Sequence, residues 1–411
     1  MAKNFQKGKI IACLDIGSSK LMCLIAIINN DDIKILGYSH KESRGIVGGG
    51  ISDMRLAQKS ITNAVSEAER MAGLNIEKLL VNISGNQVTS TRKEESIKIT
   101  SSMVKSSDIS NLASKLRSQY RRDHREMIHL IPLQYRIDDS SPVINPRYMS
   151  GNKLFAKFHA ISTSKTTILN IENCLKRCQL SINNYIVEPY ASALACLNEN
   201  EINLGNLLID IGADITSFCL MLEGKLVYVG SIAIGGNHIT KDISTILGVN
   251  FNAAEKIKNL NSSLFVSPIE EKEVIKFRMT ENDAPAMYKI TRLELCEIIS
   301  SRLEEIFEAI KITMAKNKVP DFLVNNITLT GGVSAIVGID KLAEDIFDKD
   351  VRIGYPTQLP DILPELDFPN YACALGMLVF SKNLLQKEKI KGGFEIKGNW
   401  FRNFIEKLVS V

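Results

Sequence analysis

The carboxylates best placed to do chemistry lie in two copies of an Asp-Ile-Gly turn. One copy occupies residues 15–19 and the other residues 210–216, and each follows an apolar run typical of a buried strand. Glycine lets the backbone approach an anion closely, and successive amides in such a turn can surround phosphate oxygens. A single motif of this kind would more often be only a turn. Two copies at matched positions favour a site that holds a polyphosphate from both sides.

The aspartates of these turns, Asp15 and Asp210, would repel phosphate if they touched it directly. We therefore expect a Mg²⁺ ion near them, held largely through water, because Mg²⁺ keeps several waters and takes few carboxylate ligands. The neighbouring groups are expected to bind the phosphates. They are Gly17, Ser18, Ser19 and Lys20 in the first turn, and Gly212, Ala213, Asp214 and Thr216 in the second.

Glu188 precedes a proline at the start of an expected helix. An acid at that position is favoured by the helix dipole alone. Beside a phosphate it could instead orient the water that attacks a γ-phosphate. Both interpretations stay open. On the second, the candidate catalytic residues are Glu188, Asp210 and Asp15, and any hydrolysis would be slow and regulatory.

Two further glycine clusters differ in what they predict. Gly331 and Gly332 follow an apolar strand and, with Val333, open a helix, so a base and ribose could lie against the bare backbone. Residues 45–53 contain three consecutive glycines but lack the Lys and Ser/Thr of a P-loop, and no G-x-G-x-x-G pattern occurs. We interpret that segment as a flexible turn.

The elements that must position these residues occur in a repeated order. Strand, Asp-Ile-Gly turn, strand and strand begin at residue 9 and again at residue 206, about 195 residues later. Such a repeat indicates a duplicated α/β unit. Apolar spacing predicts helices over residues 54–72 and 292–316. Residues 84–163 differ in composition from the segments around them, with Ser/Thr/Lys-rich strands and one basic helix. This composition predicts an inserted α+β subdomain.

Composition limits the class of protein. The 411 residues are 45% hydrophobic and 23% charged, with a net charge of +4, which is ordinary for a globular protein with a large core. That charge is too small to indicate nucleic-acid binding, and the basic run at residues 115–125 is expected to be a solvated helix face. Scattered single cysteines are typical of a reducing compartment. With neither a signal peptide nor an 18-residue apolar run, we expect a cytoplasmic protein.

The final residues predict a helix that lies on a membrane. Their spacing places the apolar side chains on one broad face: Trp400, Phe401, Phe404, Ile405, Leu408 and Val409. Arg402 and Lys407 flank this face and suit anionic lipid headgroups. Docking on the protein's own core is the alternative, disfavoured by the polar stretch at residues 386–397. One such helix binds reversibly, whereas many stacked copies bind with high avidity.

Taken in order, five motifs resemble those of the actin, Hsp70 and sugar-kinase superfamily. Residues 15–19 and 210–216 resemble its two phosphate loops, residues 330–334 its adenosine loop, and residues 188–193 and 371–376 its connections between lobes. The resemblance implies an α/β fold with two duplicated actin-like (ribonuclease-H-like) lobes, binding ATP and Mg²⁺ between them.

Within that superfamily the chain resembles the bacterial cell-division family FtsA. The residues that carry the resemblance are the glycine turn at 43–53, two segments of the insert at 130–138 and 157–161, and segments 234–242 and 253–258. The resemblance implies that Gly235, Gly236 and Asn237 border the phosphates and that Glu255 and Lys258 border the adenosine.

The FtsA resemblance also implies a function. It implies an ATP-binding, filament-forming protein that anchors FtsZ filaments to the inner face of the cytoplasmic membrane at the division site. The implied partners are the C-terminal tail of FtsZ, further copies of the chain, anionic lipid and other divisome proteins, with no nucleic acid. A pilus-assembly scaffold is the nearest alternative. A small-molecule kinase would need an acceptor base that we do not find, and a chaperone would need a substrate domain.

These motifs divide the chain into several expected parts, two of which are interrupted by another part. They are the lobe 1 core at 1–83 and 164–205, the insert at 84–163, the lobe 2 core at 206–232 and 305–365, a smaller subdomain at 233–304 as candidate FtsZ-docking site, a return helix at 366–381, a flexible linker at 382–398 and the membrane-targeting helix at 399–411.

Overall fold

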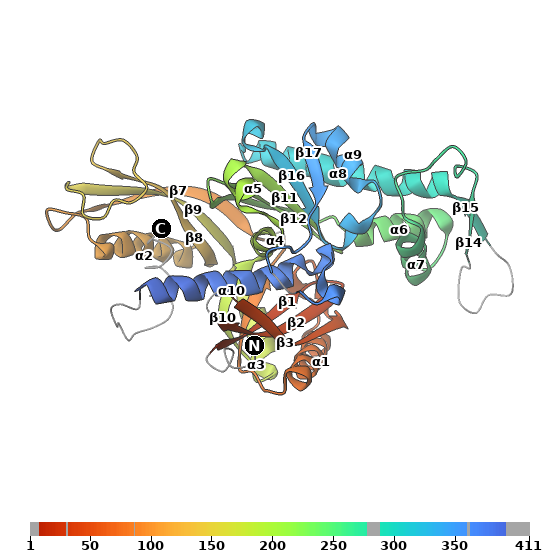
Figure 1. Cartoon of the computed structure of the whole chain (residues 1–411), viewed down its shortest axis with the longest axis horizontal. Coiled ribbons are helices and arrows are strands. Elements are labelled where there is room, and N and C mark those ends of the chain that lie inside the picture. The colour runs from red at the N-terminus through yellow and green to blue at the C-terminus, as the bar shows by residue number, and fades with distance from the viewer. Residues whose placement is uncertain (1–7, 30–31, 86, 278–287, 360–361, 392–411) are drawn as a thin grey trace.

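The computed structural model describes residues 8–29, 32–85, 87–277, 288–359 and 362–391. Two lobes lie against each other, and a third body projects to one side (Figure 1). Each lobe is built on a five-stranded sheet.

The lobe 1 sheet has the order β10-β6-β1-β2-β3. Its strands are β1 (Lys9–Ile16), β2 (Lys20–Asn29), β3 (Asp32–Glu42), β6 (Lys78–Ile83) and β10 (Ser181–Val187). β1 pairs antiparallel with β2 and parallel with β6, and β6 pairs parallel with β10. The residues between β1 and β2 form a tight connection, as predicted.

The lobe 2 sheet repeats this arrangement in the order β13-β12-β11-β16-β17. Its strands are β11 (Asn206–Ile211), β12 (Thr216–Leu222), β13 (Lys225–Ile232), β16 (Asn326–Thr330) and β17 (Asp350–Ile353). β11 pairs antiparallel with β12 and parallel with β16, as β1 does with β2 and β6. The duplication expected from the sequence is therefore present in both sheets.

Four helices cover the two faces of the lobe 1 sheet. α1 (Met54–Ala72) and α3 (Lys165–Arg177) pack on one face, and α4 (Glu188–Cys196) and α10 (Ala372–Lys391) pack on the other. α1 has the predicted bounds because Asp53 caps its first amides and Gly73, with φ of 68°, ends it in the left-handed conformation.

Lobe 2 has one continuous core beneath its helices. Its remaining elements are α5 (Glu199–Leu204), α6 (Gly236–Leu247), α7 (Phe251–Asn261), β14 (Val274–Phe277), β15 (Tyr288–Thr291), α8 (Arg292–Lys316) and α9 (Ile339–Phe347). Short 3₁₀ turns complete the described chain at η2 (Asp321–Leu323), η3 (Gly332–Ala335), η4 (Pro364–Leu366) and η5 (Pro369–Tyr371). α8 has the predicted bounds.

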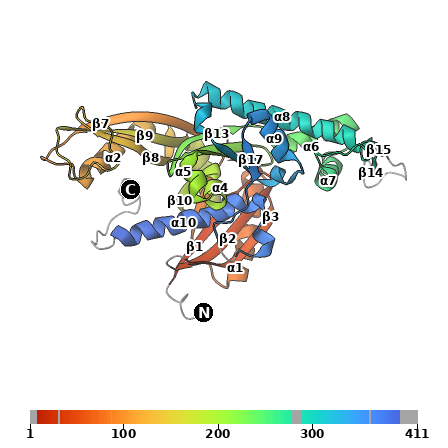
Figure 2. The ribbon, with the colours of Figure 1, turned by 45° about the horizontal axis from the view of Figure 1, so that its top comes forward.

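The projecting body is the inserted subdomain, with a small core of its own. It consists of β7 (Thr89–Lys98), α2 (Ser106–Arg122), β8 (Arg125–Ile137) and β9 (Lys153–Ser164). β9 lies between β7 and β8, and both pairings are antiparallel. In Figures 1 and 2 this body lies at the opposite end of the molecule from β14 and β15.

Three local expectations differ from the structure. The glycine turn is ordered into a small hairpin of β4 (Ile46–Val47) and β5 (Gly50–Ile51), and Gly332 opens a 3₁₀ turn rather than an α-helix. α10 continues to Lys391, so the first part of the segment expected as a flexible linker is helical. The reason is that Lys, Leu, Gln and Glu are good helix formers, and no glycine occurs between residues 377 and 391. Residues 399–411 lie outside the described part of the chain.

None of the helices in the described residues is long and apolar enough to cross a membrane.

The tightest helix contact joins α4 and α10. A Cβ atom added at Gly376 would lie 1.8 Å from the carbonyl oxygen of Ala191, well inside contact distance. We expect Gly376→Ala to lower the free energy of unfolding by about 2–3 kcal/mol, because two backbones must separate. Urea denaturation measures it. The control is Gly50→Ala, whose Cβ has no neighbour closer than 3.8 Å and should leave stability nearly unchanged. Equal stability of the two variants would show that the helices can move apart at no cost.

Candidate functional site

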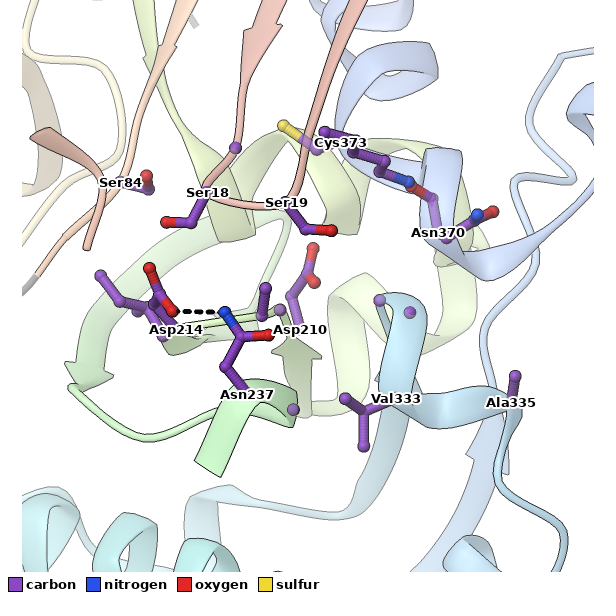
Figure 3. Close-up of a pocket in the computed structure, with 18 of the residues that line it drawn as sticks. Ser18, Ser19, Ser84, Asp210, Asp214, Asn237, Val333, Ala335, Asn370 and Cys373 are labelled. Atoms are coloured by element: carbon purple, nitrogen blue, oxygen red, sulfur yellow. Dashed lines mark hydrogen bonds between the residues drawn. The ribbon is translucent and has the colours of Figure 1, made fainter. Parts of the chain in front are cut away.

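A cavity of about 570 Å³ lies between the lobes, at the carboxyl ends of the parallel strands (Figure 3). Open α/β sheets bind ligands at this edge. All three candidate catalytic residues line it, as do most residues expected to bind a nucleotide. These are Asp15, Gly17, Ser18, Ser19, Lys20, Glu188, Asp210, Gly212, Ala213, Asp214, Gly236, Asn237, Glu255, Lys258, Gly331, Gly332 and Val333.

The two Asp-Ile-Gly turns have the same backbone geometry. Gly17 donates its amide to the carbonyl of Lys20 at 3.1 Å, and Gly212 donates to the carbonyl of Ile215 at 3.0 Å. A Cβ at either glycine would lie 2.9 Å from the carbonyl oxygen that closes its turn. Both turns therefore require glycine, and they present backbone to the cavity from opposite lobes.

Three carboxyl groups lie together at the back of the cavity: Asp15 and Asp210 are buried, and Glu188 is half-buried. Asn82 Nδ2 donates to Asp15 Oδ1 at 2.7 Å, and Ser192 Oγ donates to Asp210 Oδ2 at 2.6 Å. Ser217 Oγ donates to Glu188 Oε2 at 3.3 Å. Each acid is thus held in place through one of its oxygens.

Burial dominates the acid–base properties of this cluster. It raises the pKa of Asp210 to about 6, the hydrogen bond from Ser192 opposes the shift, and the charge of Asp15 adds to it. It also raises the pKa of Asp15, and that of Glu188 well above its ordinary value, where Asp210 and Asp15 add to the shift. Lys20 is half-buried beside them, and desolvation of its ammonium lowers its pKa. A cluster of acids that resists ionisation is an environment in which a bound cation is favourable.

Magnesium fits this cluster through water and phosphate rather than through a closed protein cage. In the part of the chain that the structure describes, no three His, Cys, Asp or Glu side chains come together as a metal-binding group. The oxygens of Asp15 and Asp210 that carry no protein hydrogen bond could hold the water shell of the ion.

Glycine lines the part of the cavity next to Asp210. Gly331 has φ of 88°, and a Cβ there would lie 2.4 Å from Asp210 Oδ1, whereas a Cβ at Gly332 would meet nothing within 4 Å. Position 331 therefore requires glycine, because of its backbone conformation and its close neighbours. At position 332 the absence of a side chain leaves open space in the cavity. A flat group can lie over this backbone, as predicted for a base and ribose.

Lys258 lines the cavity but is only 7% exposed. Its Nζ donates to the carbonyl of Gly236 at 3.2 Å, to Thr240 Oγ1 at 2.7 Å and to Glu255 Oε2 at 2.7 Å. Because an ammonium has three donors, Lys258 positions Glu255 and joins α6 to α7 rather than reaching a ligand.

Two residues expected at the phosphates do not line the cavity. Thr216 is buried and donates Oγ1 to the carbonyl of Ile234 at 2.8 Å. A Cβ at Gly235 would lie 2.6 Å from the carbonyl oxygen of Gly212. Both residues hold the start of α6 against the second turn, so they shape the site without facing a ligand.

Several cavity residues were missed by sequence reasoning. They are His40, Glu42, Gly49, Ser84, Ile215, Asn259, Ser262, Ala335, Ile336, Asn370 and Cys373. Ser84 directly follows β6, which runs parallel to β1, so its side chain lies at the same edge of the sheet as the first Asp-Ile-Gly turn. The order of the strands could therefore have revealed it.

The glycine turn at residues 45–53 is more than the flexible connection expected from the sequence. Gly48 donates its amide to Asp214 Oδ2 at 3.1 Å across the cleft. Asp214 also accepts from Asn237 Nδ2 at 2.7 Å (Figure 3).

The inserted subdomain contacts the framework of the site through His129. Its Nε2 accepts the amide of Val187 at 3.1 Å, immediately before Glu188. The ring lies edge-on to Tyr190 of α4 and Phe380 of α10, with centroids 5.6 and 5.9 Å away. The start of the helix that carries Glu188 is therefore fixed by a residue of the insert.

The remaining candidate residues lie outside the described part of the chain. These are the membrane-binding set Trp400, Phe401, Arg402, Phe404, Ile405, Lys407, Leu408 and Val409.

Comparison with known families and proteins gives a consistent result. The family model "Cell division protein FtsA" matches residues 207–376, and the model "SHS2 domain inserted in FTSA" matches residues 85–162. The cell division protein FtsA of Neisseria meningitidis is 32% identical, with 91% of this chain and 90% of the relative covered. That of Pseudomonas aeruginosa is 30% identical, with 96% and 94% covered.

Solved structures confirm the predicted actin-like fold with an inserted subdomain. The PilM-PilN type IV pilus biogenesis complex matches with a TM-score of 0.65 at 15% identity, covering 90% of this chain and 98% of that one. MreB5 of Spiroplasma citri bound to AMPPNP matches with a TM-score of 0.57 at 18% identity, covering 94% and 99%. At these identities the likeness concerns the fold alone.

The buried acids generate a test of stability. We expect Asp210→Asn to raise the free energy of unfolding at pH 7.5 by about 1–3 kcal/mol, because the neutral amide removes a buried charge. In the folded protein the pKa is about 6 against an ordinary 3.8, so ionisation destabilises the fold fully above pH 6 and not below pH 4. The gain should therefore shrink at pH 4.5 in urea titrations.

The matched control is Asp345→Asn, an exposed acid on α9, which should change stability by less than about 0.5 kcal/mol at either pH. A loss of stability in Asp210→Asn at pH 7.5 would mean that the ionised carboxylate is well solvated or paired.

Proposed function

Because the chain belongs to the FtsA family of cell-division proteins, we propose that it binds ATP with Mg²⁺ and forms filaments that anchor FtsZ to the inner face of the cytoplasmic membrane at the division site. The observation that carries this proposal is the pair of matched Asp-Ile-Gly turns, which face each other across one cavity beside Asp15, Glu188 and Asp210. The MreB5 structures with ADP and with AMPPNP share this fold, which supports nucleotide binding.

In this proposal the phosphates lie between the two turns and the adenosine lies over Gly331 and Gly332. Asp15 and Asp210 would hold the water shell of Mg²⁺, which would add to the positive charge of Lys20 beside the acids. Glu188 is placed to orient a water beside the terminal phosphate. Its fixed position, between Ser217 and the helix start held by His129, supports that role. Hydrolysis would be slow and would regulate filament formation.

The tail of FtsZ is proposed to bind in a groove between α6 and α8, within the smaller subdomain of lobe 2. The groove has a volume of about 950 Å³ and combines apolar and charged side chains. Arg302 is held rigidly by Asp242, with its Nε and Nη2 donating to the two carboxylate oxygens at 2.6 and 2.8 Å. Ile246 lines the groove and is 63% exposed, so it is available to an apolar side chain of a peptide.

We expect Ile246→Glu to weaken binding of an FtsZ tail peptide by about tenfold or more, since a charge replaces an apolar contact. Fluorescence anisotropy of the labelled peptide measures the affinity. Leu260→Glu is the matched control, because Leu260 is 81% exposed on neighbouring α7 but does not line the groove. Equal affinities of the two variants would place the docking site elsewhere.

Membrane attachment is proposed to reside in Trp400, Phe401, Phe404, Ile405, Leu408 and Val409, with Arg402 and Lys407 at the headgroups. A single short interfacial helix binds weakly, so attachment should depend on filament formation.

The test is co-sedimentation with vesicles of phosphatidylglycerol and phosphatidylethanolamine, with Mg-ATP and FtsZ present. The full chain should bring FtsZ into the pellet, and a version ending at Gly398 should leave both proteins in the supernatant. Asp210→Ala, which lacks a proposed Mg²⁺ group, should reduce pelleting in the full chain. Pelleting of the shortened chain would refute the anchor. If neither the full nor the shortened chain pellets with the vesicles, the proposed tether function is wrong, and the protein has another role within the family.

A further inference from the structure

The inserted subdomain is the most positively charged part of the protein. Residues 84–163 contain thirteen Lys and Arg against seven Asp and Glu, a net charge of +6. The whole chain has +4, so the remaining residues sum to −2. The positive charge of the protein is thus concentrated in this body.

Much of this charge lies on one face of the insert's sheet. α2 covers the other face, where Thr91 Oγ1 meets the hydroxyl of Tyr120 and Lys115 pairs with Glu95 at 2.8 Å. Side chains alternate between the two faces of a strand, so the neighbours of those that face α2 point to the uncovered side of the sheet. We call this the open sheet face, formed by Arg92, Glu94, Lys98, Gln134, Arg136, Lys153, Phe155 and Lys157.

The charges of the open sheet face are poorly compensated within the protein. Lys98 lies directly opposite Lys153 across β7 and β9, an arrangement that destabilises a sheet. Among the described residues, neither lysine forms an ion pair, and neither do Arg92 and Lys157. Only Arg136 is paired, at 3.8 Å from Glu94 and 3.6 Å from Asp139, and both acids are well exposed.

Phe155 lies at the centre of this face beneath two cations. The guanidinium carbon of Arg136 is 4.0 Å from its ring centroid, and Lys153 Nζ is 4.6 Å away. These contacts hold the two cations over the sheet. The result is a flat surface with an ordered positive centre.

The same sheet face already packs against protein at its inner end. Val229 of β13 donates its amide to Ser90 Oγ at 3.2 Å, and His159 Nδ1 donates to the carbonyl of Leu226 at 2.8 Å. In Figure 2, β7, β8 and β9 extend outward beyond their contact with β13. Strand register places the open sheet face on the same side of the sheet as Ser90 and His159. Its shape therefore suits another protein segment.

We propose that the open sheet face binds an acidic segment of a partner protein. A bilayer fits less well, because Phe155 lies under cations and no apolar side chain of this face projects to enter lipid. A nucleic acid fits less well, because bases need uncovered aromatic rings for stacking. Carboxylates of an extended chain would complement the five cations at the spacing of the strands.

The experiment uses the full chain and a fluorescein-labelled dodecapeptide of alternating Glu and Thr, followed by anisotropy at two salt concentrations. The variant Arg92→Glu/Lys98→Glu/Lys157→Glu reverses three cations that have no ion pair in the described chain. The control Lys59→Glu/Lys78→Glu/Lys318→Glu makes the same change of net charge at exposed lysines elsewhere. Urea titrations establish that both variants are folded.

We expect the face variant to bind the acidic peptide about tenfold more weakly or worse, and the control to bind within about twofold of the native chain. The face variant should also acquire affinity for a Lys-Thr peptide. Equal loss in both variants, or no binding by the native chain, would overturn the proposal. Loss of phosphatidylglycerol-vesicle or oligo(dT) binding in the face variant alone, with peptide binding unchanged, would assign the face to lipid or nucleic acid instead.

Discussion

The crowding of three acids into one buried cavity is the constraint on which the rest of the structure depends. Loss of hydration raises the pKa of Asp15, Glu188 and Asp210, and repulsion between the acids adds to the shift at Glu188 and Asp210. The fold offsets this cost with a hydrogen bond to each acid and with dense apolar packing behind it, including the close contact of α4 and α10. A cation bound between the acids would relieve this repulsion.

The sequence predicted the parts of this site that are local. The two turns, the bounds of α1 and α8 and the duplicated strand order all follow from short-range patterns of glycine, caps and apolar spacing. Residues such as Ser84, Asn370 and Cys373 could not be found that way, because topology alone brings them to the cavity. Lys258 illustrates a second limit of sequence-based prediction. Only the structure reveals that its three N–H donors already form hydrogen bonds within the protein. The helical start of the expected linker was missed because its charged residues were interpreted as signs of flexibility rather than as helix formers.

The inserted subdomain does more than project from lobe 1. His129 holds the start of α4, and His159 and Ser90 form hydrogen bonds to the edge strand of lobe 2. Burial lowers the pKa of His159 to about 4 and that of His129 to about 3, so both rings are neutral hydrogen-bonding groups at physiological pH. The subdomain therefore braces both lobes beside the cleft, and its contact through His129 holds the start of the helix that carries Glu188.

α10 has a mechanical consequence. It begins beside Asn370 and Cys373 of the cavity and runs without a break to Lys391, toward the side of the inserted subdomain (Figures 1 and 2). Twenty residues of helix span about 30 Å. The first half of this helix is packed into the core of lobe 1 and against α4, so its direction is fixed by the body of the protein. A continuous helix anchored in this way is a rigid spacer, and the chain continues from a point about 30 Å from the cavity end of the helix.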